Sequence, residues 1–181
     1  MPRKIIVHVA MSADGFIARP DGSVDWLDRP RPKGNYGMNE FYRSIDTIIL
    51  GRKTYDVALE FEKQGKVAAP FDPGKKHYIF SRTLTSSARA GLEFVDEPVK
   101  EFAARLRNEP GKDIWNMGGA EIIGAFLDAG EVDEFSIAVI PTFIGEGIPL
   151  IAPRRRTVPL ELLSAKSFPD GVVLLNYKCV R

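Results

Sequence analysis

A short apolar segment that ends at two glycines constrains the fold of this chain more than any other stretch. Residues Ile114 to Met117 are followed by Gly118 and Gly119, and helix-forming residues begin at Ala120. This order predicts a strand, a tight turn and a helix. Glycine lets the backbone pass close to another group, and the N–H groups at the start of a helix favour an anion. The spacing is not Gly-x-Gly-x-x-Gly, so the dinucleotide-binding fingerprint of Rossmann folds is absent here. Both a phosphate site and a turn without a ligand fit the pattern.

Length and charge favour one globular domain with a small partner. The chain has 181 residues, and we predict a single domain over residues 1–181. Its 25 Lys and Arg nearly balance its 24 Asp and Glu, for a net charge of +1. Such a balance does not favour nucleic acid or an anionic membrane as the partner. No apolar run reaches the length of a bilayer span. We expect a small-molecule substrate.

Cysteine and histidine are scarce. The single cysteine, Cys179, excludes an internal disulfide and fits a reducing, cytoplasmic location. Only His8 and His77 could add nitrogen ligands, so we predict no metal site. His8 lies in an apolar strand-like run, and we interpret it as a core or edge histidine with a satisfied ring.

Hydrophobic patterns predict an α/β fold. Buried strands separated by connections that include helices are expected at 4–10, 47–50, 77–80, 92–95 and 113–117. From Val132 onward strands follow one another at 134–140, 160–168 and 172–180. The fold class is therefore a mainly parallel central sheet flanked by helices, with a C-terminal antiparallel hairpin.

We also make predictions for several segments that connect the strands and helices. The Pro- and Gly-rich segment from Pro30 to Gly37 is long enough to act as a lid. Asn39 is expected to cap a short helix after it, and residues 61–74 are predicted to be loop. The basic run Arg154-Arg155-Arg156 is interpreted as a solvated loop, with a phosphate grip as the alternative.

Three predicted strands end in small or cationic residues, at 51–54, 81–82 and 118–120. The carboxyl ends of parallel strands share one edge of a sheet, so these segments can converge. Helix N-termini there would face a pyrophosphate, and an added ribose phosphate would meet Arg52, Lys53, Ser81 and Arg82. The cations favour NADPH over NADH, with solvated surface charges as the alternative.

Six segments in this order resemble the dihydrofolate-reductase-like superfamily. They are Ser12–Ala18, Gly51–Tyr55, Tyr78–Arg82, Gly118–Glu121, Val132–Glu134 and Pro141–Gly147. The closest resemblance is to single-domain proteins similar to the C-terminal reductase half of the bifunctional riboflavin-biosynthesis deaminase-reductase (RibD). The resemblance covers nearly the whole chain.

This resemblance implies an NADPH-dependent reductase that is usually a homodimer. By position, the cofactor would lie against Ala10, Ile17, Gly51, Arg52, Lys53, Thr54, Ser81, Arg82, Met117, Gly118, Gly119, Ala120, Glu121 and Ile123. Ala10 and Ile17 would flank the nicotinamide. The resemblance also implies a cis peptide between Gly118 and Gly119.

Two departures leave the substrate open. No carboxylate stands clearly at the pterin-binding position of dihydrofolate reductases, and Glu40 is the nearest acid. After Thr54 the chain reads Tyr55-Asp56-Val57-Ala58-Leu59, where the riboflavin enzymes have an Asp-Asp-Pro element that helps to bind the sugar phosphate. Reduction of 5-amino-6-(5-phosphoribosylamino)uracil and reduction of dihydrofolate therefore stay alternatives.

The expected reaction is hydride transfer from NADPH to a C=N or C=O bond of a small heterocyclic substrate. Asp14 and Glu40 are the candidate catalytic residues, with water as another proton source. Asp14 is equally consistent with an Asp-Gly turn that fixes its loop. Trp26, Phe41 and Tyr55 could wall a planar ring or belong to the core. A non-catalytic NADPH-binding protein is the alternative of another class.

Overall fold

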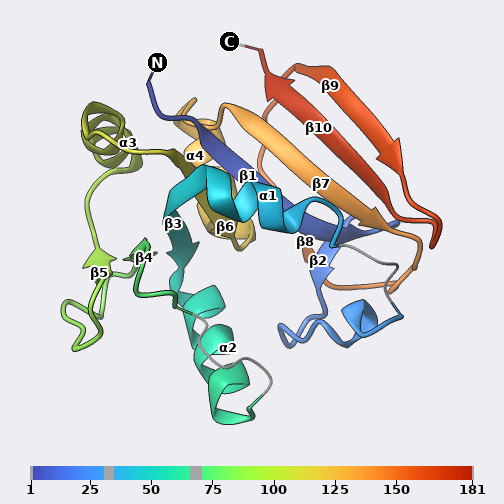
Figure 1. Ribbon diagram of the computed structural model, residues 1–181, viewed down its shortest axis with the longest axis horizontal. Coiled ribbons are helices and arrows are strands. Elements are labelled where there is room, and N and C mark those ends of the chain that lie inside the picture. The colour runs from blue at the N-terminus through green and yellow to red at the C-terminus, as the bar shows by residue number, and fades with distance from the viewer. Residues whose placement is uncertain (1, 31–34, 66–70, 181) are drawn as a thin grey trace.

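An eight-stranded β-sheet runs through the middle of the protein (Figure 1). The computed structural model describes residues 2–30, 35–65 and 71–180. Across the sheet the strands follow the order β5-β4-β3-β6-β1-β7-β10-β9. Their bounds are β1 (Ile5–Ser12), β3 (Ile45–Gly51), β4 (Lys76–Phe80), β5 (Leu92–Val95), β6 (Asp113–Gly118), β7 (Glu134–Ile140), β9 (Leu160–Ser167) and β10 (Val173–Cys179).

The sheet is parallel from β5 across to β7, and antiparallel at its other end. There β10 runs antiparallel to β7, and β9 runs antiparallel to β10. The helices are α1 (Met38–Ser44), α2 (Arg52–Lys63), α3 (Val99–Asn108) and α4 (Ala120–Asp128). None of these described helices is long and apolar enough to cross a bilayer. The predicted fold class is confirmed, including the C-terminal hairpin.

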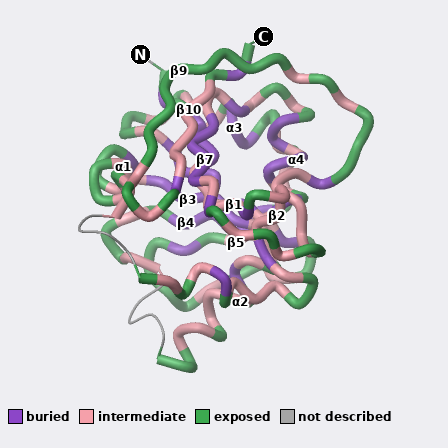
Figure 2. The backbone as a smooth tube through the Cα atoms, turned by 90° about the vertical axis from the view of Figure 1, so that its right-hand side faces the viewer, coloured by how far each residue is buried: buried purple, intermediate pink, exposed green. Residues whose placement is uncertain are grey.

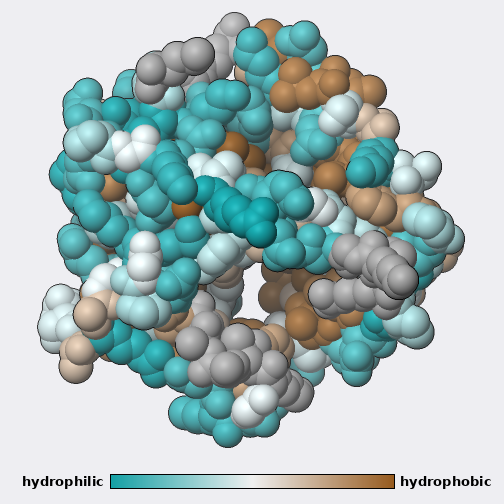
Figure 3. All heavy atoms as spheres, viewed as in Figure 1, coloured by the Kyte–Doolittle hydropathy of each residue, from teal (hydrophilic) through white to brown (hydrophobic). Residues whose placement is uncertain are grey.

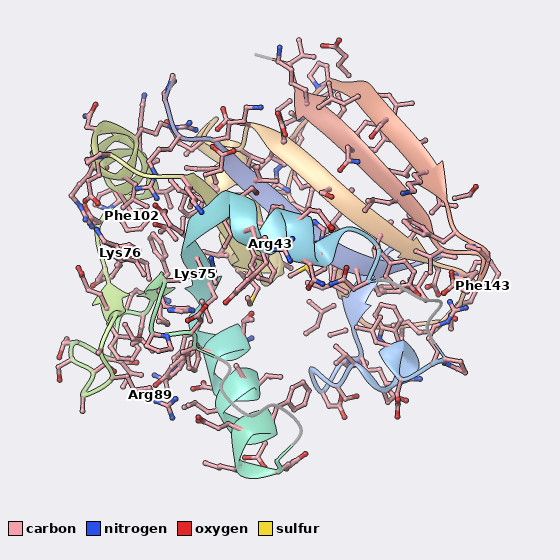
Figure 4. The ribbon with its side chains drawn as sticks, viewed as in Figure 1. Arg43, Lys75, Lys76, Arg89, Phe102 and Phe143 are labelled. Carbon is pink, nitrogen blue, oxygen red and sulfur yellow. The ribbon has the colours of Figure 1, made fainter. Side chains whose placement is uncertain are left out.

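The α3 and α4 helices cover one face of the sheet. Phe102 of α3 and Phe126 of α4 are completely buried there against Ile5 and Val7 of β1. Phe102 lies where α3 meets the sheet (Figure 4). Apolar residues three and four positions apart give each helix one buried stripe, which is why both pack flat on the strands.

The α1 and α2 helices pack on the opposite face. Ile48, Leu50 and Trp115 form its buried centre, with Tyr55 of α2 and Phe41 of α1 packed against them. Burial in the molecule is concentrated along the central strands (Figure 2). The unbroken apolar runs of β1 and β3 follow from this arrangement, because both of their faces are covered.

One pair of short strands was not predicted, and two local expectations were wrong. A second, two-stranded sheet pairs β2 (Phe16–Ala18) with β8 (Ile148–Pro149), which the pattern did not predict. The first helix begins at Met38 after Gly37, whose φ of 84° is left-handed, so Asn39 is not its cap. The α2 helix continues to Lys63, so the loop predicted from residue 61 begins later. Residues 31–34 of the predicted lid and Pro70 lie outside the described residues.

A buried arginine ties together the amino ends of β1, β3 and β6. Arg3 is 5% exposed, and its guanidinium pairs with the Asp46 carboxylate. It also donates to the Lys112 carbonyl oxygen at 2.6 Å and to the Thr47 hydroxyl at 2.6 Å. The backbone N–H of Lys112 donates to the other Asp46 oxygen at 2.8 Å. This network fixes the relative positions of strands whose opposite ends carry the candidate site.

Replacing Arg3 should be costly, because it takes the counter-ion from the Asp46 carboxylate and the guanidinium donor from the Lys112 carbonyl oxygen. We expect Arg3→Met to lower the free energy of unfolding by about 3 kcal/mol. The matched control is Arg43→Met on α1, an exposed arginine (Figure 4), which should change it by less than about 0.5 kcal/mol. Urea unfolding measures both, and equal losses would contradict the role given to Arg3.

Candidate functional site

The carboxyl ends of β3, β4 and β6 lie side by side, as the sequence predicts. Leu50 pairs with Gly118, and Gly51 pairs with Phe80 of β4. A Cβ atom added to Gly51 would lie 3.8 Å from the Gly118 carbonyl oxygen and 3.9 Å from the Gly119 nitrogen. The backbones of the two glycine segments are therefore in contact at one edge of the sheet.

Two helices begin at this edge without a side-chain cap. Gly51 is the N-cap of α2 and Gly119 is the N-cap of α4, and glycine has no side chain to accept from the first N–H groups. Thr54 in the first turn of α2 reaches the other helix start, because its hydroxyl lies 3.3 Å from the position of a Cβ on Gly119. Two positive helix ends thus face the same space, which suits a pyrophosphate.

The glycine pair has the geometry that the resemblance implies. The peptide bond between Gly118 and Gly119 is cis, and φ of Gly118 is 95°. A Cβ on Gly118 would lie 3.0 Å from Cδ1 of Ile123, which is completely buried beneath it. Both the positive φ and the close approach require glycine at this position.

A hollow opens beyond these strand ends. It lies between α2 and the segment that carries β2 and a 3-10 helix, η1 (Asp25–Leu27), with α1 above it (Figure 3). Hydrophobic surface borders the hollow on the side of β2 (Figure 3). Ile17 of β2 reaches the glycine turn, because its Cδ1 lies 3.9 Å from the position of a Cβ on Gly119. The hollow therefore connects the glycine turn with β2.

The predicted ribose-phosphate residues lie on α2 and in the loop after β4. Arg52 donates to Asp56 at 2.8 Å, and its Nη1 lies 3.4 Å from the Thr83 hydroxyl. Lys53 and Arg82 are exposed. The Ser81 hydroxyl is buried and accepts from the N–H groups of Thr83 and Leu84. Ser81 thus shapes the loop, and Arg52 spans the gap between α2 and that loop.

The other predicted cofactor residues differ in exposure. Ala10 and Met117 are half-buried, on β1 and β6. Ala120 is buried at the start of α4, whereas Glu121 beside it is 79% exposed and lies 3.6 Å from Arg154. Arg154 and Arg156 both pair with Asp128 of α4. The two arginines are therefore held against α4 by ion pairs.

Asp14 joins two loops. Its carboxylate accepts from the Ser12 hydroxyl at 2.6 Å and from the N–H groups of Ile144 at 3.1 Å and Gly145 at 2.8 Å. The Ser12 hydroxyl is the main cause that lowers the pKa of Asp14, and the backbone donors add to it. An acid with a lowered pKa is ionised at neutral pH, so this geometry fits the loop-fixing role and not a proton donor.

The three candidate ring-wall residues do not form one wall. Trp26 is buried in a cluster with Ile140. Tyr55 lies in the core, with its ring centroid 5.3 Å from that of Phe71. Phe41 lines the cavity described below. Glu40, next to it on α1, is exposed.

The cavity under the start of α1 has a volume of about 190 Å³. It is lined by Ile6, His8, Tyr36, Gly37, Phe41, Glu134, Phe135, Ser136, Leu174 and Asn176. His8 stacks on Phe41 with ring centroids 4.2 Å apart. Its buried Nδ1 has no hydrogen-bond partner among the described residues. The expectation of a satisfied ring was therefore wrong.

His8 is a candidate site residue that the sequence reasoning missed. Burial lowers the pKa of His8 to about 4, so the ring is neutral at physiological pH. A neutral ring with an unpaired nitrogen can bind a polar group that enters the cavity. The signal in the sequence was the alternation of β1, which puts Ile6, His8 and Ala10 on one face of the sheet.

Comparison with known proteins assigns the chain to a family. The sequence model of the RibD C-terminal domain matches residues 3–174. The chain belongs to this family. It is 39% identical to the uncharacterized protein YwjB of Bacillus subtilis (strain 168) over 176 residues, which cover 96% of this chain and 97% of YwjB.

Two solved structures have the same fold. The first is a Shewanella sp. PV-4 protein whose name connects it with riboflavin biosynthesis, with a TM-score of 0.86, 25% identity and 100% of both chains covered. The second is the dihydrofolate reductase of Enterococcus faecalis in complex with NADP(H), with a TM-score of 0.65 and 17% identity. That match covers 98% of this chain and 97% of the reductase. The suspected superfamily is confirmed.

Alanine at position 118 should destabilise the glycine turn. We expect Gly118→Ala to lower the free energy of unfolding by about 2 to 3 kcal/mol, because it combines a left-handed φ with a Cβ that meets Ile123. Gly130→Ala is the control, since Gly130 has a φ of 72° and open space around it. That variant should lose only about 1 kcal/mol. If both variants lose the same free energy of unfolding in thermal unfolding, Ile123 moves aside without cost and the prediction is contradicted.

The neutral His8 predicts a pH dependence of stability. Its pKa is about 4 when folded and about 6.5 when unfolded, so the unfolded chain binds this proton more tightly. The free energy of unfolding should therefore rise between pH 4 and 6.5, by up to about 3 kcal/mol, and stay level above. His8→Leu should remove this contribution. Urea unfolding across this range measures it, and a pH-independent difference between variant and wild type would contradict the buried neutral state.

Proposed function

We propose that this protein is an NADPH-dependent reductase. The observation that carries the proposal is the contact between the two glycine segments, which brings two uncapped helix N-termini to one hollow. Membership of the RibD C-terminal domain family and the fold shared with a dihydrofolate reductase bound to NADP(H) support it. The same edge carries Arg52, Lys53 and Arg82 for a phosphorylated ribose.

The residues present fit such a cofactor. The first N–H groups of α2 and α4 would hold the pyrophosphate, and the missing Cβ atoms at Gly51 and Gly119 let it approach the backbone. Ile17 and Ala10 would border the nicotinamide. When bound, NADPH supplies the hydride. The chain contributes binding, orientation and exclusion of water from the hollow.

We place the substrate in the hollow below α1, on the side of β2. The proposed reaction reduces a C=N or C=O bond of a small heterocycle, of the type found in 5-amino-6-(5-phosphoribosylamino)uracil. The ionised Asp14 would hold the loop after β1 against the loop after β7, so that β2 stays beside the glycine turn. The proton would come from water or from Glu40, whose helix α1 lies above α2 and β2 (Figure 1).

We further propose that the protein acts as a homodimer in the cytoplasm. A chain with one cysteine fits a reducing compartment. Dihydrofolate reduction is the alternative activity on the same fold. NADPH oxidation with each of the two substrates distinguishes them, and binding of NADPH without turnover of either would favour a nucleotide-binding protein.

Removal of the two arginines at the adenosine end should distinguish NADPH from NADH. We expect Arg52→Ala with Arg82→Ala to weaken NADPH binding about 10- to 100-fold, because two charged hydrogen bonds to the extra phosphate are lost. NADH binding should change less than about threefold, since NADH lacks that phosphate. Fluorescence titration measures both affinities. Arg43→Ala, an exposed arginine on α1, is the control, and equal losses for both cofactors would refute this placement.

A further inference from the structure

The β6 strand contains a buried polar side chain that its surroundings do not explain. Asn116 is 0% exposed, and in the sheet it pairs with Val7 of β1 and Ile49 of β3, which are both completely buried. Alternation along β6 places it on the same face as Ile114, in the core that α3 and α4 cover. Asparagine is uncommon in such a position, because most fully buried residues are apolar. Its presence there indicates a specific role.

The Asn116 amide uses its oxygen and leaves its nitrogen unpaired. Oδ1 accepts a hydrogen bond from the backbone N–H of Gly118 at 3.0 Å. Only the oxygen of an amide side chain can accept from an N–H group, so this contact fixes which way the amide is turned. The buried Nδ2 has no hydrogen-bond partner among the described residues. A buried donor without an acceptor lowers stability, because the amide has given up its hydrogen bonds to water.

This hydrogen bond acts on the glycine turn. Gly118 is the last residue of β6 and has a φ of 95°, and Gly119 after it is the N-cap of α4. A side-chain oxygen that accepts from the N–H two residues further along fixes a bend that strand pairing alone does not specify. Asn116 therefore holds the backbone at the point where the chain leaves the sheet for α4.

Asn116 cannot contact a ligand in the hollow itself. Its side chain is completely buried, and it lies on the face of the sheet opposite α1 and α2. The hollow opens between α2 and β2, with α1 above it (Figure 3). Any effect of Asn116 on a ligand is therefore transmitted through the turn, which makes it a positioning residue.

We propose that Asn116 positions the Gly118–Gly119 turn for a nucleotide pyrophosphate. Its Oδ1 keeps the Gly118 N–H in place, so that the first N–H groups of α4 point at the ligand. The unpaired Nδ2 lowers stability, which the fold tolerates in exchange for an ordered turn. The identity of the ligand rests on the proposed function, to which this inference adds a residue outside the glycine pair and the two helix starts.

The first test replaces the amide with an apolar side chain. Asn116→Leu removes the acceptor of the Gly118 N–H and also removes the unpaired Nδ2, so its two effects on stability oppose one another. The midpoint of thermal unfolding should therefore shift by less than about 4 °C. NADPH binding should weaken about tenfold, because the cofactor must then order a turn that no side chain holds. Calorimetric titration measures the affinity.

The second test, Asn116→Asp, should give the opposite pattern. The carboxyl group keeps an oxygen that accepts from Gly118, and burial should keep it protonated at pH 6, so NADPH should bind within about threefold of wild type. The midpoint at pH 6 should fall by more than about 4 °C, because the unfolded chain ionises this carboxyl and the folded protein does not. A role in stability alone would instead make the less stable variant the weaker binder.

Hydrogen exchange measures the order of the turn without a cofactor. In the protein without NADPH, the Gly118 amide should exchange slowly in wild type and in Asn116→Asp, and at least about tenfold faster in Asn116→Leu. Asn108→Leu is the matched control, since Asn108 is the exposed last residue of α3. This variant should leave both the exchange rate of Gly118 and the affinity for NADPH unchanged.

The results distinguish this inference from the proposed function. A wild type and an Asn116→Leu variant that bind NADPH equally well would overturn the positioning role alone. Equal loss of affinity in Asn116→Leu and Asn116→Asp, or equal exchange of the Gly118 amide in all variants, would also overturn it. Absence of NADPH binding by wild type would overturn the proposed function, and the exchange rates of Gly118 would then decide whether Asn116 fixes the turn.

Discussion

The close approach of two backbone segments at the ends of β3 and β6 is the constraint on which the rest of the structure depends. A Cβ at Gly51 would already touch the Gly118–Gly119 peptide, and the turn itself needs glycine because a side chain at Gly118 would run into Ile123. Because the strands are parallel, the helices that follow both start at this contact. Two partial positive charges therefore meet where the chain leaves the sheet, and an anionic ligand is the natural complement.

Polar side chains hold this edge in place from two directions. At the opposite ends of the strands, Arg3 links the start of β3 to the segment before β6. This link fixes the position of the two strands relative to each other. At the near end, the Asp14 carboxylate ties the loop after β1 to the loop after β7. β2 starts just after Asp14 and so carries Ile17 to the glycine turn. Neither residue needs to contact a ligand for its loss to disturb the site.

The parallel sheet and the convergence of its strand ends could be predicted, because apolar runs, glycines and helical stripes are local patterns. The β2–β8 pair could not be predicted, because strands of only two or three residues, one of them with a proline, show no periodic hydrophobic pattern. The partners of Asp14 are backbone groups far along the chain. The unpaired Nδ1 of His8 depends on α1 placing Phe41 over the ring. Tyr55 faces the core, and its position in the first turn of a helix does not show from the sequence which way its side chain points.

The central claim is that the glycine edge binds NADPH, and calorimetric titration of the purified protein with NADPH tests it most directly. It predicts saturable binding of one NADPH per chain, with NADH bound more weakly by at least about tenfold because the arginines lose the ribose phosphate. Absence of NADPH binding, or equal affinity for both cofactors, would contradict it. The fold would stand in either case, since it rests on packing and pairing within the chain.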